Sequence, residues 1–143
     1  MEAVILFVLL LFLVIIAYSD VVINRIPNIC LLGVLLCSCT AAVLLENVSS
    51  SERFMGCFFI SLPMLLCALI KPGAFGGGDI KLMAFSGIYL GLDGIITAFA
   101  AAVFLAGSYI FIMTAAGRNP RVIPFGPFLS AGIIMEALRL LFL

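Results

Sequence analysis

The chain has 143 residues, of which 66% are hydrophobic and only 10% charged, and its formal net charge is zero. Soluble domains are typically about 45–50% apolar and about 25% charged, so this chain has too few polar side chains to cover a water-facing exterior. The composition excludes an ordinary soluble globule, a disordered tail and a basic nucleic-acid-binding protein. It predicts a single transmembrane domain over residues 1–143.

Six apolar segments follow one another, separated by short clusters of glycine, proline, asparagine, serine and charged residues. Period-two alternation is absent, and backbone polar groups in lipid must be satisfied within helices. These features predict an all-α polytopic membrane protein with six transmembrane helices. The expected helices are residues 3–19, 28–45, 54–70, 79–92, 95–116 and 127–142. The fourth is short, at about 21 Å, against a hydrocarbon core of about 30 Å.

The distribution of basic residues predicts the orientation of the chain in the cytoplasmic membrane. With six spans, one side of the membrane collects Arg25, Lys71, Lys81, Arg118 and Arg121. The other side collects only Arg53 and Arg139. The first group is therefore expected in the cytoplasm, and both termini and the loop of residues 46–53 are expected outside.

The chain contains no histidine, and its five cysteines include no CxxC pair. The commonest neutral-pH acid–base group and the commonest metal ligand are therefore both missing. A zinc module of CxxC spacing is not expected, and the cysteines are interpreted as small buried hydrophobic residues. No metal ion or other cofactor is predicted.

Two acidic residues lie at the expected ends of apolar segments. Asp20 follows the first segment, and Asp79 follows Gly76, Gly77 and Gly78 at the start of the fourth. Acidic residues within membrane segments are costly and therefore indicate function. About 27 Å of helix precedes Asp20, so both acids are expected at the same face of the membrane. The structural alternatives are a solvated acid at a helix end for Asp20 and a helix N-cap for Asp79.

Two carboxyl groups that share a proton can hydrolyse a peptide bond, because one activates water and the other donates a proton. Asp79, at a helix N-terminus, is expected to hold the anion, and Asp20, at a helix C-terminus, to hold the proton. The glycines of residues 73–78 are expected to let an extended peptide approach the backbone. Lys81 is expected either to hold polar groups of the substrate or to anchor its helix at the interface.

Other patterns predict packing and turns. The GxxxG of residues 87–91 predicts close helix packing, and residues 93–94 predict a turn on the outer side. Residues 124–127 predict a rigid turn that leads into the last helix. Glu136 and Arg139 are predicted to form an ion pair at i,i+3 spacing.

Three short motifs occur in order along the chain. They are Asp20 followed by Arg25-Ile26-Pro27-Asn28, then Gly76-Gly77-Gly78-Asp79-Ile80-Lys81, and finally Ile123-Pro124-Phe125-Gly126-Pro127-Phe128-Leu129. Together they resemble the three signature regions of type IV prepilin peptidases, which are bacterial membrane aspartic peptidases of the GxGD kind. The resemblance covers nearly the whole chain.

The resemblance implies that Asp20 and Asp79 are the catalytic aspartates, with Gly76, Gly77, Gly78 and Lys81 in supporting or substrate-binding positions. It implies a prepilin or pseudopilin substrate, whose short basic leader is removed at the cytoplasmic face, after glycine or alanine. The longer members carry an additional cytoplasmic domain near the N-terminus. This chain is expected to be the short form found in tight-adherence pilus systems, without N-methyltransferase activity.

Two other functions compete with this interpretation. Intramembrane acids and a glycine-broken helix also suit a small ion- or proton-coupled transporter. A non-catalytic assembly scaffold related to a peptidase is the other alternative. The transporter is disfavoured because the acids are expected near one membrane face and no internal repeat is evident. The scaffold is disfavoured because both aspartates are present.

Overall fold

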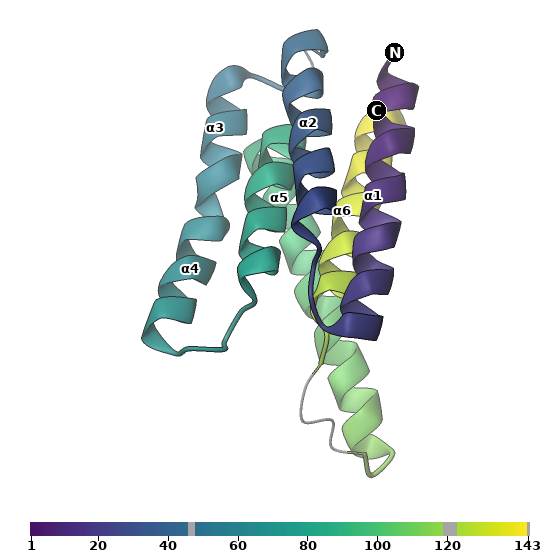
Figure 1. The fold of residues 1–143 in the computed structure, drawn as a ribbon, viewed down its shortest axis with the longest axis vertical. Coiled ribbons are helices and arrows are strands. Elements are labelled where there is room, and N and C mark those ends of the chain that lie inside the picture. Colours follow the sequence, from purple (N-terminus) through teal and green to yellow (C-terminus); the bar gives the residue numbers. More distant parts are fainter. Residues whose placement is uncertain (46–47, 119–122, 143) are drawn as a thin grey trace.

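The computed structural model describes residues 1–45, 48–118 and 123–142, and helix is the only regular secondary structure within them. The helices are α1 (Glu2–Ile23), α2 (Asn28–Leu44), α3 (Ser50–Phe59), α4 (Ser61–Ile70), α5 (Gly77–Ala115) and α6 (Gly126–Phe142). Figure 1 shows them as a bundle of roughly parallel and antiparallel rods. The predicted all-α fold is confirmed. Helix α1, the α3–α4 unit and α5 are long and apolar enough to cross a membrane.

Helix α5 contains two arms that meet at Gly91, where the backbone is non-helical with φ 75° and ψ −174°. In Figure 1 the arm before this residue rises toward one end of the bundle, and the arm after it returns beside it. The expected helices at residues 79–92 and 95–116 are therefore these two arms. The predicted turn at residues 93–94 is wrong, since both are helical. The reversal falls at Gly91 because glycine adopts positive φ readily.

The expected helix at residues 54–70 is interrupted at Ile60, which separates α3 from α4. Pro63 lies within the first turn of α4 and lacks the N–H that would bond to the carbonyl of Phe59. The missing hydrogen bond explains why the helix breaks one residue after Phe59. The hydroxyl of Ser61 donates to the carbonyl of Cys57 across the break.

Small residues bring α3 against the first arm of α5. A β-carbon on Gly56 would lie 2.7 Å from the carbonyl oxygens of both Gly87 and Gly91. A β-carbon on Gly87 would in turn lie 2.9 Å from the backbone nitrogen of Cys57. The close helix packing predicted from the GxxxG is thus confirmed, because backbone meets backbone at this crossing.

Arg53 joins three elements at the end of the bundle that holds the Gly91 reversal. Its side chain is 6% exposed. The guanidinium donates to the carbonyl of Ile88 at 2.9 Å, to that of Leu45 at 2.9 Å and to that of Val48 at 3.1 Å. It therefore satisfies carbonyls that the last turns of the first α5 arm and of α2 leave free.

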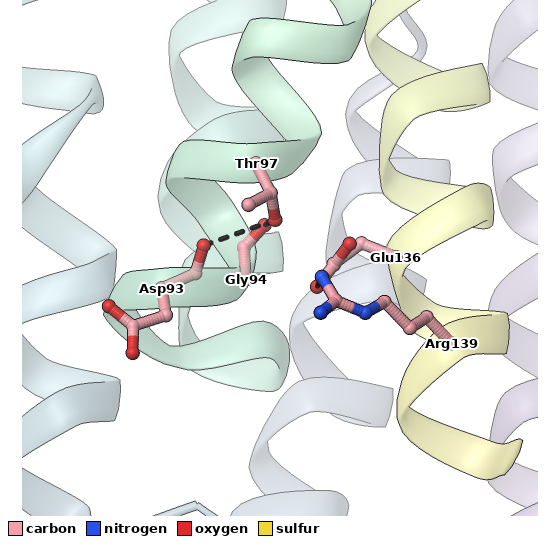
Figure 2. A network of polar contacts seen from close by, with 5 residues as sticks. All are labelled: Asp93, Gly94, Thr97, Glu136 and Arg139. Carbon is pink, nitrogen blue, oxygen red and sulfur yellow. Dashed lines mark hydrogen bonds and ion pairs between the residues drawn. The ribbon is translucent and has the colours of Figure 1, made fainter. Parts of the chain in front are cut away.

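The predicted ion pair on α6 is confirmed, with Nη1 of Arg139 lying 3.3 Å from Oε1 of Glu136. Figure 2 shows Glu136 pointing toward the second arm of α5, close to Gly94. A β-carbon on Gly94 would lie 3.5 Å from Cγ of Glu136. On the same arm, the hydroxyl of Thr97 donates to the carbonyl of Asp93 at 3.1 Å (Figure 2). Glu136 thus has an ion-pair partner and a packing role.

The start of α1 and the end of α6 lie at the same end of the bundle, which is also the end of the Gly91 reversal (Figure 1). This arrangement is the one that an even number of crossings produces. Arg121, which entered the prediction of orientation, lies outside the described residues, as do residues 46 and 47 of the expected outer loop. The second arm of α5 extends past the other helices at the opposite end (Figure 1).

Replacement of Gly87 by alanine is expected to destabilise the protein by about 1–3 kcal/mol, because the new methyl group must push α3 away from α5. The measurement is the fraction of detergent-solubilised protein that stays monodisperse after heating. Gly107→Ala is the matched control, since a β-carbon there meets nothing within 4 Å. Equal thermal stability of the two variants would contradict the described crossing.

Candidate active site

A cavity of about 580 Å³ lies at the end of the bundle opposite the termini. Three stretches of chain that are far apart in the sequence line it. The first is Asp20 with residues 24–26, at the end of α1. The second is residues 73–79, which lead into α5, and the third is residues 123–125, which precede α6. The cavity thus gathers the three motifs that the sequence analysis singled out.

Asp20 lies in the last turn of α1 and is 7% exposed. Helix α1 ends at Asn24, which adopts the left-handed conformation with φ 52° and returns its N–H to the carbonyl of Asp20. The chain then turns, and Pro27 is the N-cap of α2. The carboxylate of Asp20 accepts a hydrogen bond of 2.9 Å from the backbone N–H of Gly126, the first residue of α6.

Asp79 lies in the first turn of α5 and is 8% exposed. It is not the N-cap, which is Gly76. Its Oδ1 is buried and has no hydrogen-bond partner among the described residues. Its Oδ2 faces Gly76, where a β-carbon would lie 3.1 Å away. Asp79 lines the same cavity as Asp20.

The three consecutive glycines form one wall of the cavity together with Ile26. A β-carbon on Gly78 would lie 2.8 Å from Cβ of Ile26, whereas one on Gly77 would meet nothing within 4 Å. Glycine at position 78 therefore lets the start of α5 approach the turn that follows Asp20. Gly76, Gly77 and Gly78 all line the cavity with the two aspartates.

Lys81 is the predicted site residue that the fold does not bring into this group. Its side chain is exposed, and it does not line the cavity. Of the two roles expected for Lys81, this position fits the interfacial anchor better than contact with the reacting groups.

Sequence reasoning missed two features of the cavity. One is Gly126, whose hydrogen bond to Asp20 joins residues 106 positions apart. The turn at residues 124–127 was recognised, but nothing local indicated which carboxylate it would meet. The other is an aromatic pair between Phe75 and Phe125, with ring centroids 6.0 Å apart. These two rings join the glycine-rich segment to the segment that precedes α6.

The arrangement places two carboxyl groups in a cavity with room for water and for a short stretch of peptide. Asp20 accepts a hydrogen bond from the N–H of Gly126. Asp79 has a backbone hydrogen bond with Gly76, while its Oδ1 is buried without a partner among the described residues. Such a pair can share a proton and act on a water molecule. The described residues contain no group of three or more His, Cys, Asp or Glu side chains placed to hold a metal ion.

Comparison with known proteins agrees with this geometry. Residues 7–111 match the type IV leader peptidase family, and these residues include both aspartates. The chain belongs to the type IV leader peptidase family. It is also 31% identical over 128 residues to a prepilin leader peptidase/N-methyltransferase of Bacillus subtilis (strain 168). The similarity covers 88% of this chain and 52% of that protein, so the chain spans about half the length of this relative. No solved structure matches the chain.

Membership of the family confirms the resemblance found from the three motifs. Together with the apolar helices, it identifies an integral membrane protein. The matched residues run through the end of α1, the glycine-rich segment and most of α5. They therefore include the elements that carry the two carboxyl groups, while α6 lies beyond them.

Replacement of Gly78 by alanine is expected to destabilise the protein, because the methyl group would overlap Ile26, at a cost of about 1–3 kcal/mol. Gly77→Ala is the matched control, because a β-carbon on Gly77 would meet nothing within 4 Å. Both variants are compared by the temperature at which half of the protein loses its monodisperse peak in size-exclusion chromatography. A Gly78→Ala variant as stable as Gly77→Ala would show that the cavity wall is built differently.

Proposed function

We propose that the chain is a membrane aspartic endopeptidase that removes the leader peptide from prepilins or pseudopilins. The observation that carries the proposal is that Asp20 and Asp79, from distant parts of the chain, line one cavity together. Membership of the type IV leader peptidase family supports the same activity. The substrate class follows from that family and from the name of the Bacillus subtilis relative.

In the proposed mechanism, Asp20 carries the negative charge and Asp79 carries the shared proton. The N–H of Gly126 donates to Asp20 at the N-terminus of α6, where the helix dipole favours an anion. Asp79 has a buried oxygen without such a donor among the described residues, and burial disfavours a second charge beside Asp20. This assignment reverses the one expected from the ends of α1 and α5, because it includes the contribution of α6.

Hydrolysis then proceeds in two steps. Asp20 accepts a proton from a water molecule as the water oxygen attacks the carbonyl carbon of the scissile peptide bond, while Asp79 donates its proton to the carbonyl oxygen. The resulting tetrahedral species breaks its carbon–nitrogen bond as Asp20 returns the proton to the leaving nitrogen. The hydroxyl proton then passes back to Asp79 as the carbonyl reforms. Each aspartate thus ends in its starting state.

The backbone of residues 73–78 is the proposed support for the substrate. These residues line the cavity, and glycines at positions 76, 77 and 78 leave the backbone open to an extended peptide. Water can attack the carbonyl carbon of a peptide bond only when that bond is in an extended and not a helical stretch of the substrate. The scissile bond is therefore proposed to lie in an extended stretch between the glycines and the two aspartates.

The cavity is proposed to face the cytoplasm, with both termini on the outer side. Arg25 lines the cavity, Lys71 is the C-cap of α4, and Lys81 lies near the start of α5. An excess of positive charge of this kind is typical of cytoplasmic loops. Arg53 and Arg139 belong to the other end, where Arg53 is buried against backbone carbonyls.

Replacement of either Asp20 or Asp79 by asparagine is expected to lower the rate of leader removal by about 1,000-fold or more, because acid–base catalysis needs both groups. The measurement is the mass of a leader-bearing pilin that is co-expressed with each variant. Asp93→Asn is the control, since Asp93 is exposed and lies on α5 near the Gly91 reversal. Near-normal cleavage by Asp20→Asn would contradict the two-aspartate mechanism. Ion flux without cleavage would instead favour the transporter.

The orientation is tested with cysteine variants of a chain whose five native cysteines are replaced by alanine. Ala74→Cys, in the cavity wall, is expected to react with a membrane-impermeant thiol reagent in inverted vesicles but not in intact spheroplasts. Ser51→Cys, an exposed position near the other end of the bundle, is expected to show the reverse pattern. Labelling of Ala74→Cys in intact spheroplasts would place the cavity on the outer side.

A further inference from the structure

We propose that Gly126 is a positioning residue for the hydrolysis. Its backbone N–H fixes the carboxylate of Asp20, and its lack of a side chain is what allows the start of α6 to come that close. This inference rests on the proposed peptidase function. It assigns a role to the third motif, for which the sequence predicted a rigid turn into the last helix and a family resemblance but no function for Gly126.

The hydrogen bond between the two residues is buried and joins distant parts of the chain. The N–H of Gly126 donates to Oδ2 of Asp20 at 2.9 Å, and both residues are buried. The N–H groups of a first helical turn have no partner within their own helix, so this one is free to bind a carboxylate. Because this donor belongs to the backbone, its position does not depend on the rotamers of neighbouring side chains.

The space around Gly126 is occupied by Asp20 itself. A β-carbon on Gly126 would lie 2.7 Å from Oδ2 of Asp20, 2.9 Å from its Cγ and 3.0 Å from its Cβ. The first two distances are too short for a real contact, and the third is tighter than most real contacts of a β-carbon. The positions of Gly77 and Gly107 differ from this one, because a β-carbon there would meet nothing within 4 Å. Alanine at position 126 must therefore move Asp20, α6 or both.

Neither α6 nor Asp20 can move without disturbing its own surroundings. Helix α6 is held by Leu129 and Ile133, which are completely buried in the core of the bundle. Asp20 lies in the last turn of α1, which is closed by the N–H of Asn24. The carboxylate is therefore the part that moves most easily, and its movement changes its distance from the attacking water. A misplacement of about 1 Å at a reacting group costs about 100-fold in rate.

A second reason for glycine at position 126 is purely structural. Residue 127 is a proline, whose ring clashes with the β-carbon of a preceding residue in helical conformation. Glycine has no β-carbon and therefore avoids this clash, whatever the position of Asp20. The two explanations make different predictions, because only the first depends on the carboxylate at position 20.

The first experiment measures kcat and KM for leader removal by purified protein in detergent. Gly126→Ala is expected to lower kcat by about 100-fold while KM changes little, because substrate contacts are intact and the acid–base group is displaced. Gly107→Ala is the matched control and is expected to retain the wild-type kcat. A Gly126→Ala variant with wild-type kcat would overturn the proposal.

The second experiment measures the thermal stability of Gly126→Ala in two backgrounds, the natural chain and Asp20→Ala. Removal of the carboxylate vacates the space that the new methyl group needs, so the loss of stability is expected to be much smaller in the Asp20→Ala background. An equal loss of stability in both backgrounds would show that glycine is needed at position 126 because of Pro127 and not because of Asp20. That result would overturn the proposal. This experiment does not depend on enzymatic activity.

The two proposals can therefore fail separately. If the wild-type chain leaves the leader of a prepilin intact, the proposed peptidase function is wrong, even where the stability measurements verify the contact between Gly126 and Asp20.

Discussion

The carboxylate of Asp20, which lines the cavity, is held by a hydrogen bond from the backbone N–H of Gly126. This bond ties the last turn of the first helix to the first turn of the last one. In a bundle surrounded by lipid, a buried carboxylate needs a donor, and few polar side chains are available to supply one. The backbone at the start of a helix supplies it without adding a charge. The ends of two helices, α1 and α6, therefore hold the acidic group in place.

Glycine has a related role elsewhere in the bundle, since it brings backbone against backbone. Gly91 turns α5 back on itself, and Gly56 and Gly87 allow α3 to lie against the first arm. These contacts hold the short arm, whose first turn contains Asp79. Because the arm is packed along its length, the position of Asp79 is set by the same helix crossing that buries the core. Stability and the placement of the carboxyl group are thus coupled in α5.

The helical segments and the meeting of Asp20 with Asp79 at one end of the bundle were predictable from the sequence. Apolar runs and their lengths determine both features, because helices of known rise must alternate across a slab of fixed thickness. The reversal lies at Gly91, whereas the sequence predicted it at residues 93–94. The prediction was wrong because an Asp-Gly pair is typical of turns, and a glycine inside GxxxG is typical of helix packing. The contact of Gly126 with Asp20 leaves no local pattern, because it joins residues 106 positions apart.

The unequal arms of α5 have a consequence for the surrounding lipid. At about 1.5 Å per residue, the arm before Gly91 is about 21 Å long and the arm after it is about 36 Å. The short arm is buried or half-buried from Leu82 to Leu90, so helices and not lipid surround it. The long arm, in contrast, exposes large apolar side chains such as Phe104 and Phe111. Because it is longer than a hydrocarbon core of about 30 Å, it must tilt within the bilayer or extend beyond it.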